Sequence, residues 1–198
     1  EYCLNLGGFA NVSTREEKRI AYDICPANIV LNHYINRIGK PYDDEGKLAS
    51  QGLVNAELLE KLNKLPFYNE KPPKSLGLEW VKANVIPLID SYDLELKDIL
   101  RTFVEHVAIQ LSRVLIKDGN VLVTGGGAYN NFLIERTETL SKPTIVLPEK
   151  ILIEFKEALI FGFLGVLKLR NETNVLSSVT GAEKDHSSGV IFHYNNQN

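Results

Sequence analysis

The sequence has 198 residues, of which 44% are hydrophobic and 24% are charged, a balance typical of a globular domain. Lysine and arginine number 22 against 25 aspartates and glutamates, and the resulting net charge of −3 disfavours a nucleic-acid partner, which needs clustered positive charge. The most apolar stretch, residues 158–169, is too short to cross a bilayer, so no membrane partner is expected.

Cysteine usage indicates a reducing compartment. Cys3 and Cys25 form neither a disulfide framework nor a zinc-type motif, so we expect two reduced core thiols, with a disulfide between them as the alternative. No signal peptide is visible, which favours a cytoplasmic location. The chain has no methionine and begins inside a strand-like segment. We therefore expect a fragment, a processed chain or the ordered part of a longer protein.

The first half of the chain begins with three short strands, predicted at 2–6, 9–13 and 19–23 and joined as an antiparallel meander. A helix should follow from Pro26 to Gly39, because proline suits a first helical turn and glycine a helix end. The proline- and glycine-containing region at about 40–93 is interpreted as an insertion on the main fold. It is predicted to hold two helices, at 55–64 and 78–89.

The second half alternates helices and strands. A wide apolar stripe predicts a helix over 95–117. Two β-branched runs predict buried strands at 120–124 and 143–147, with helices on both sheet faces. The helices after these strands are predicted at about 130–140 and 154–170, and apolar residues on most faces of the second one predict deep packing. The remainder is expected to be loop, with one short strand at 190–194.

This order, βββαβαβα, is that of one half of the duplicated ribonuclease-H-like fold of actin- and hexokinase-type ATPases. It predicts an α/β domain over residues 1–198, with a mixed five-stranded sheet flanked by helices and a helical insertion. A second copy normally precedes this one in the fold. We expect that N-terminal half to lie outside the chain.

Two glycine clusters are candidate anion sites. Gly7 and Gly8 stand between the first two strands, with Asn11 after them, and there the backbone can approach an anion closely. The alternative is an ordinary hairpin turn. The second cluster, residues 125–127, joins a buried strand to a helix near Asn130, an arrangement that suits a nucleotide. The alternative there is a tight connection, and the spacing matches neither a Rossmann fingerprint nor a P-loop.

Two carboxylates also allow two interpretations each. Glu157 lies near the start of an apolar helix, where it either reaches into a pocket or is stabilised by the helix dipole. Asp23 ends the third predicted strand, where it either caps the next helix or helps to hold magnesium. His33 and His106 fall in helices and are interpreted as structural or surface residues.

Seven stretches of the chain form a distinctive series: LNLGGFANVS (4–13), YDICPANIVLNHY (22–34), GKPYDDEGKLASQGLVN (39–55), KPPKSLGLEW (71–80), VTGGGAYNNFL (123–133), EFKEALIFGFLG (154–165) and SSVTGA (177–182). In these stretches, which cover nearly the whole chain, the sequence resembles the anhydro-N-acetylmuramic acid kinase family. They occur in family order, and the segments KPYD and PKS are absent from general sugar kinases.

The resemblance implies a kinase that opens 1,6-anhydro-N-acetylmuramic acid with water and phosphorylates O6, giving N-acetylmuramic acid 6-phosphate in peptidoglycan turnover. It implies ATP and Mg²⁺ as cofactors, an amino sugar as substrate and a homodimer as the assembly. By this resemblance, a phosphate-contacting turn is matched by Gly7, Gly8 and Asn11. The segment beside the nucleotide is matched by Gly125, Gly126, Gly127 and Asn130, and a carboxylate that contacts the sugar is matched by Glu157.

The resemblance also implies that parts of the enzyme lie elsewhere. The first phosphate loop and the water-activating aspartate are expected before Glu1, so no catalytic residue or metal ligand is assigned in this chain and the isolated chain is expected to be inactive. Residues 23–28 read DICPAN where the family commonly has DTGPGN, so no direct ligand contact is expected there. The alternatives are a non-catalytic nucleotide- or sugar-binding module of this fold and a kinase for another amino sugar.

Overall fold

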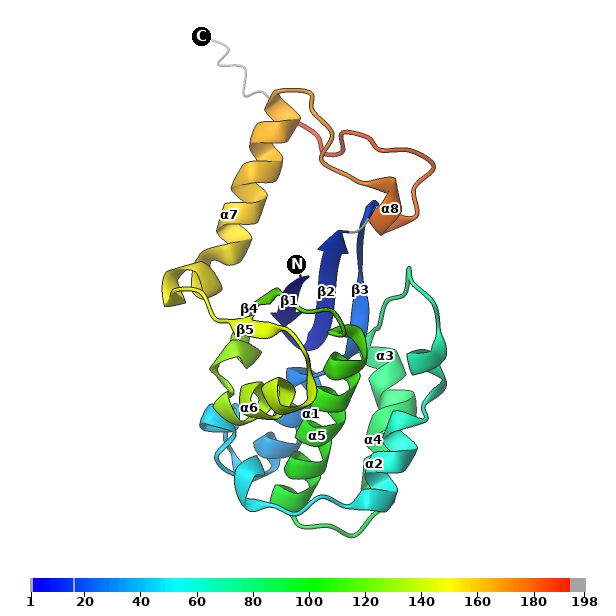
Figure 1. Ribbon diagram of the computed structural model, residues 1–198, viewed down its shortest axis with the longest axis vertical. Coiled ribbons are helices and arrows are strands. Elements are labelled where there is room, and N and C mark those ends of the chain that lie inside the picture. The colour runs from blue at the N-terminus through cyan, green and yellow to red at the C-terminus, as the bar shows by residue number, and fades with distance from the viewer. Residues whose placement is uncertain (1, 16, 193–198) are drawn as a thin grey trace.

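A computed structural model describes residues 2–15 and 17–192, and a mixed sheet of five strands lies at its centre in the order β3-β2-β1-β4-β5 (Figure 1). The first three strands pair antiparallel, whereas β4 and β5 run parallel to β1. The mixed sheet predicted from the order of elements is thus confirmed. The strands are β1 (Tyr2–Leu6), β2 (Phe9–Arg15), β3 (Arg19–Pro26), β4 (Asn120–Thr124) and β5 (Thr144–Val146).

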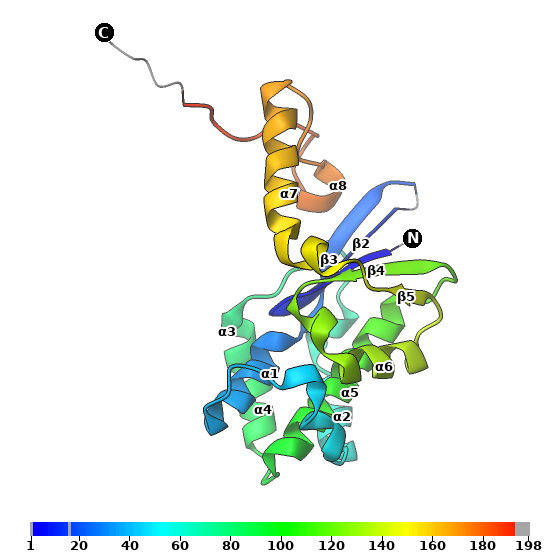
Figure 2. The same ribbon diagram turned by 90° about the vertical axis from the view of Figure 1, so that its left-hand side faces the viewer.

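One face of the sheet is covered by a helical layer, seen below the strands in Figure 2. Tyr2, Leu4 and Leu6 alternate along β1 and are all buried, because every second side chain of a strand points to the same face. The apolar stripe predicted over 95–117 is confirmed as the buried side of α5 (Leu96–Val114). The main helices of this layer are α1 (Asn28–Ile35), α5 (Leu96–Val114) and α6 (Asn131–Leu140).

The insertion packs into the same core as the sheet. Leu58 and Leu62 of α2 (Ala56–Asn63) and Ile89 of α4 (Ile86–Asp90) belong to that buried cluster. The helix predicted over 78–89 is present but changes character, because a π-helical stretch precedes Pro87, which has no N–H for the regular ladder. The elements here are η2 (Asp44–Gly46), η3 (Ala49–Gln51), α2 (Ala56–Asn63), η4 (Pro66–Asn69), α3 (Leu78–Trp80), η5 (Val81–Val85) and α4 (Ile86–Asp90), and η1 (Asn36–Ile38) precedes them.

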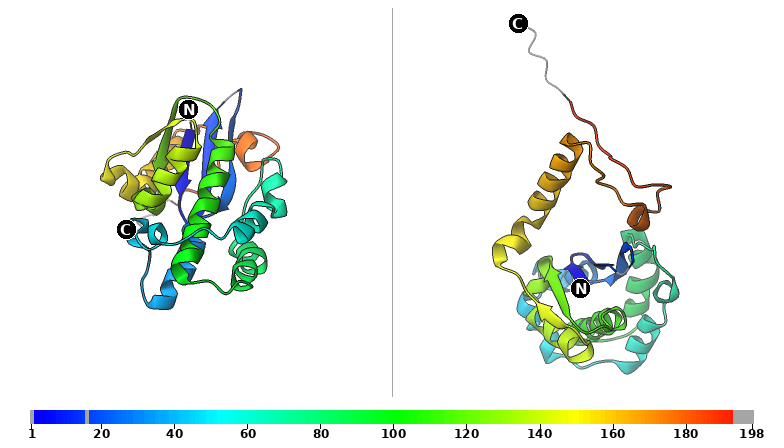
Figure 3. Two further views of the ribbon diagram at one scale, coloured as in Figure 1. Left: turned by 60° about the horizontal axis from the view of Figure 1, so that its bottom comes forward. Right: turned by 45° about the horizontal axis from the view of Figure 1, so that its top comes forward.

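The prediction of deep packing for the last long helix is wrong. The helix, α7 (Lys150–Leu169), has no buried residue, and Phe155, Leu159 and Phe161 are 60–69% exposed. Figures 2 and 3 show it rising away from the sheet on the side opposite α1 and α5. A helix that is apolar on most faces is expected to be buried against other segments, and the described residues do not bury α7. Neither α7 nor any other helix in the described ranges meets the length and apolarity needed to span a membrane.

Because α7 leaves the sheet, the second face of the sheet is only partly covered, by α8 (Ser177–Thr180) next to β3 and by Ile153 and Lys156 near the start of α7. The expectation of two fully buried late strands is therefore wrong for β5, whose Thr144 and Val146 are exposed. Cys25 is buried as expected, but Cys3 faces the open side and is exposed, and both thiols are free. Residues 190–192 form no strand, and the rest of that predicted strand, 193–194, lies outside the described residues.

Candidate functional site

A row of polar residues crosses the open face of the sheet near the ends of β1 and β4. Thr124 pairs with Asn5, Asn5 with Asn11, and Asn11 with Asp23, so the four residues follow one another across β4, β1, β2 and β3. The strand neighbours of Asn5 and Thr124, which are Leu4, Leu6 and Val123, are buried under the helical layer, and this places the row on the other face. We call Thr124, Asn5, Asn11 and Asp23 the polar row.

The first glycine turn, Gly7–Gly8, connects β1 to β2 and lies beside Asn5 and Asn11, the two middle residues of the polar row. Its carbonyl groups accept hydrogen bonds from the backbone amides of residues 27–29, over 2.8–3.3 Å, so the start of α1 is bound to the turn. Gly8 is exposed, and a Cβ there would meet only the Cβ of Ile29 at 3.6 Å, an ordinary contact. The fold therefore does not itself require a glycine at position 8.

The second glycine turn, Gly125–Gly127, follows β4 and packs against the end of β1. Gly125 has a φ of 84°, and a Cβ on it would lie 2.7 Å from Oδ1 of Asn5. A Cβ on Gly127 would lie 2.6 Å from the Cβ of Leu6. Packing therefore requires glycine at these two positions, which fits a tight connection, and a nucleotide contact by Gly125 or Gly127 stays a prediction. Gly126, by contrast, is exposed and has only Asn28 Nδ2 nearby, at 3.9 Å.

Asn28 joins the two glycine turns, and the sequence did not single it out. Its Nδ2 donates to the carbonyl oxygen of Leu6 over 3.1 Å, its backbone N–H donates to Gly7, and it lies 3.3 Å from the Cβ position of Gly127. Although residues 23–28 lack the family's glycines, this segment ends directly between the two turns. Its position at the start of a predicted helix, where asparagine often makes side-chain hydrogen bonds, was the one feature of the sequence that could have pointed to it.

Asp23 lies inside β3, which extends three residues beyond its predicted end. Its carboxylate accepts a hydrogen bond from the backbone of Leu76 over 2.8 Å, and its own N–H donates to the carbonyl of Lys74. Asp23 thus attaches the insertion to the edge of the sheet. The helix-capping interpretation is wrong, since Ala27 is the N-cap of α1 and no side chain caps it.

Asn130 is buried and directly follows η6 (Gly126–Tyr129), a short 3-10 helix that begins inside the second glycine turn and leads to α6. Its Oδ1 accepts from the backbone N–H of Leu133 over 3.0 Å, so the side chain caps α6. The predicted helix at 130–140 is confirmed, beginning at Asn131. A nucleotide contact by Asn130 stays a prediction.

Lys156, on α7, reaches the polar row and was also missed by the sequence reasoning. Its Nζ lies 2.5 Å from Oδ1 of Asn5 and 3.1 Å from Oγ1 of Thr124. Partial burial lowers the pKa of this ammonium from its ordinary value, and Glu157 opposes that shift. Glu157 itself is exposed, one residue further along α7. Its contact with a sugar remains a prediction.

A protein-only metal site is absent from the described ranges, where no three carboxylate, histidine or cysteine groups gather around one point. Asp23 supplies the carboxylate of the polar row, and one of its oxygens already accepts a hydrogen bond from the backbone N–H of Leu76. Magnesium in nucleotide sites is usually held by one or two carboxylates together with phosphates and water. The residues present thus do not make a magnesium site without a nucleotide.

The fold has a known counterpart. A solved structure of the activator of the 2-hydroxyisocaproyl-CoA dehydratase from Clostridium difficile, with bound ADPNP, superposes with a TM-score of 0.50. It is 14% identical in sequence, and the match covers 88% of this chain and 64% of that one. Together with the strand order, this likeness confirms the ribonuclease-H-like ATPase fold.

Sequence similarity identifies the family of this chain. Anhydro-N-acetylmuramic acid kinases from Sulfurimonas denitrificans and Coxiella burnetii are each 32% identical to this chain, over 205 and 206 residues. The matches cover 96% of this chain but 55% and 54% of those proteins, so the chain spans about half the length of its curated relatives. The family's sequence model, described as anhydro-N-acetylmuramic acid kinase, matches residues 1–194, and the chain therefore belongs to that family.

Proposed function

We propose that this chain is the C-terminal, nucleotide-holding half of an ATP-dependent kinase that opens 1,6-anhydro-N-acetylmuramic acid with water and phosphorylates O6. The observation that supports this best is the meeting of the two glycine turns beside the polar row. Gly8 and Gly126 are exposed there although the fold has room for a side chain at both, and exposed glycines let phosphate oxygens approach the backbone.

The reaction needs two parts, of which this chain would supply one. A general base takes a proton from water as the anhydro bond opens, and the released O6 accepts the phosphoryl group. We propose that the residues around Gly8 and Gly126 hold the phosphates of ATP, that Mg²⁺ arrives on those phosphates, and that Glu157 contacts the amino sugar. The product would be N-acetylmuramic acid 6-phosphate, formed in the cytoplasm during peptidoglycan recycling.

We further propose that the other half, with the first phosphate loop and the water-activating aspartate, is encoded upstream of Glu1. Two observations support this proposal: the chain spans about half of its relatives, and α7 leaves side chains such as Phe155 and Leu159 exposed. The complete protein is proposed to be a homodimer. Residues 1–198 alone are expected to have no kinase activity.

Activity is tested on the protein as its gene encodes it, beside residues 1–198 alone. ADP release and sugar phosphate are measured with 1,6-anhydro-N-acetylmuramic acid and with N-acetylglucosamine. We expect ADP and N-acetylmuramic acid 6-phosphate from the complete protein with the anhydro sugar, and no turnover by residues 1–198. Equal rates on both sugars would favour a kinase for another amino sugar, and ADPNP binding without turnover would favour a non-catalytic module.

The role of the glycine turns is tested with Gly126→Ala in the complete protein. A methyl group at this position is tolerated by the fold, since the nearest atom is 3.9 Å away, so lost binding would report on the ligand. We expect ADPNP to bind about tenfold more weakly by titration calorimetry. Unchanged ADPNP affinity of Gly126→Ala relative to the parent protein would contradict the proposed phosphate site.

A further inference from the structure

The side chain of Asn5 lies between the two glycine turns. Its Nδ2 is 3.3 Å from the Cβ position of Gly7, in the first turn, and its Oδ1 is 2.7 Å from the Cβ position of Gly125, in the second. The ammonium of Lys156 is hydrogen-bonded to that same Oδ1. A lysine that arrives from α7, 151 positions further along the chain, thus carries its charge to the junction of the two turns.

The two hydrogen-bond partners of this ammonium are both neutral oxygens, Oδ1 of Asn5 and Oγ1 of Thr124. Lys150, at the start of the same helix, has instead a carboxylate partner, Glu154, at 3.4 Å. A lysine ammonium has three N–H donors, and the amide and hydroxyl of the polar row use two of them. The third donor, and the positive charge, are left for an anion.

We propose that Lys156 donates a hydrogen bond to a phosphate oxygen of the bound nucleotide, and that it is the charged contact between the two glycine turns. This inference rests on the proposed function and adds a residue to its nucleotide site. A half-buried cation is screened less than a surface one, and hydrogen bonds between charged groups are stronger than neutral ones. Asn5 and Thr124 hold the ammonium in place before the ligand arrives, which lowers the entropic cost of the contact.

A competing explanation is that Lys156 only tethers α7 to the sheet. Lys156→Gln separates the two roles, because its amide still offers N–H donors to Asn5 and Thr124 while the charge is removed. Lys150→Gln is the matched control, a surface lysine on the same helix. Both variants are made in the complete protein, and binding of ADPNP, ADP and adenosine is measured by titration calorimetry.

For Lys156→Gln we expect ADPNP and ADP to bind about tenfold or more weakly, and adenosine, which has no phosphate, to bind within twofold of the parent protein. Lys150→Gln should match the parent with all three ligands. Unchanged ADPNP affinity in Lys156→Gln would overturn the proposal. So would an equal loss for ADPNP and adenosine, because a tether affects both ligands alike.

These outcomes are separable from those of the proposed function. A protein that binds ADPNP through Lys156 but does not phosphorylate the anhydro sugar would support this contact and contradict the kinase. A protein that phosphorylates the sugar while Lys156→Gln binds ADPNP normally would do the reverse. A complete protein that binds no nucleotide would overturn both.

Discussion

Gly46 and Asn130 lie so close together that no side chain fits between them: a Cβ on Gly46 would be 2.3 Å from Oδ1 of Asn130. That oxygen caps α6, the helix after the second glycine turn. A turn of the insertion therefore rests on the segment that follows the proposed nucleotide site. The insertion supports this site although it is distant from it in sequence.

Substituting Gly46 with alanine is expected to destabilise the protein by about 3 kcal/mol. The residue has a φ of 74°, which strains any side chain, and the new methyl group would collide with Asn130 and Phe132. Gly39 is the matched control, because its φ is 73° but a Cβ there meets nothing within 4 Å, so Gly39→Ala should cost only about 1 kcal/mol. Urea unfolding measures both losses, and equal losses would show that the contact with Asn130 carries no cost.

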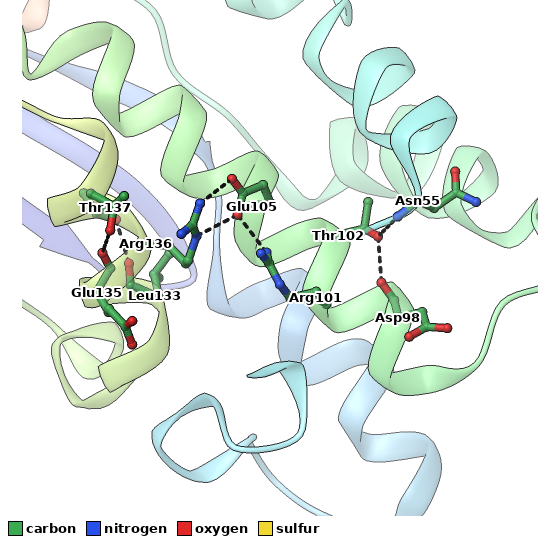
Figure 4. A network of polar contacts seen from close by, with 10 residues as sticks. Asn55, Asp98, Arg101, Thr102, Glu105, Leu133, Glu135, Arg136 and Thr137 are labelled. Carbon is green, nitrogen blue, oxygen red and sulfur yellow. Dashed lines mark hydrogen bonds and ion pairs between the residues drawn. The ribbon is translucent and has the colours of Figure 1, made fainter. Parts of the chain in front are cut away.

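Removing the charge of Glu105 is expected to cost about 2 kcal/mol at neutral pH. Both carboxylate oxygens accept from Arg136 over 2.9 Å, and Arg101 donates over 2.7 Å, which joins α5 to α6 (Figure 4). Glu105→Gln would leave two arginines facing a neutral amide. Glu138→Gln, an exposed change on α6, should stay within about 0.5 kcal/mol in urea unfolding. Similar losses in the two variants would contradict a stabilising role for the cluster.

The same cluster predicts an acid dependence. Burial alone would raise the pKa of Glu105, but hydrogen bonds from Arg136 and Arg101 outweigh it, so the pKa is lowered from its ordinary value. A lowered carboxyl pKa gives stability that is present above the ordinary range and is lost as the pH falls through the folded-state value. The unfolding free energy of the parent protein should therefore fall more steeply below pH 4.5 than that of Glu105→Gln. Parallel curves would contradict this assignment.

His106 is expected to make the protein less stable as the pH drops, in a pH range above that of Glu105. Burial, with a smaller contribution from Arg113, lowers its pKa to about 3, while Asn63 and Tyr68 hydrogen-bond the neutral ring at 2.7 and 2.8 Å. The unfolded chain binds a proton below about pH 6.5 and the folded protein does not, so folding becomes less favourable as the pH drops from there towards 3.

The measurement is urea unfolding at pH 7 and pH 5. The parent protein should lose about 2 kcal/mol more between these values than His106→Gln, which has no imidazole to charge on unfolding. His33→Gln removes an exposed imidazole from α1 and should behave like the parent. A His106→Gln variant that loses as much stability as the parent would show that the buried ring does not control this range.

Hydrogen exchange should distinguish α7 from α5. Residues of α5 such as Phe103 and Val107 are buried, whereas no residue of α7 is buried. In residues 1–198 alone, the amides of α7 should therefore exchange much faster than those of α5. In the complete protein we expect α7 to become protected, because the proposed N-terminal half would cover it. If α7 exchanged equally fast in both proteins, nothing in the complete protein would cover that helix.

Most elements could be predicted from the sequence because their signals are local. The apolar stripe of α5 and the glycines that end β1 and β4 lie within a few residues of the structure they predict. The errors arose where the partner is distant. The pattern of α7 predicted burial but could not say against what, and Thr144 and Val146 of β5 are exposed because α7 does not lie across that face of the sheet.

The sequence by itself determined the order of elements, the two glycine turns and, through its motifs, the family. Only the tertiary structure decided that Asn28 joins the turns and that Lys156 reaches Asn5. The physical reason is range: turn and helix preferences act between near neighbours, whereas the contact of Lys156 with Asn5 exists only after β1 and β4 have paired and α7 has begun above them.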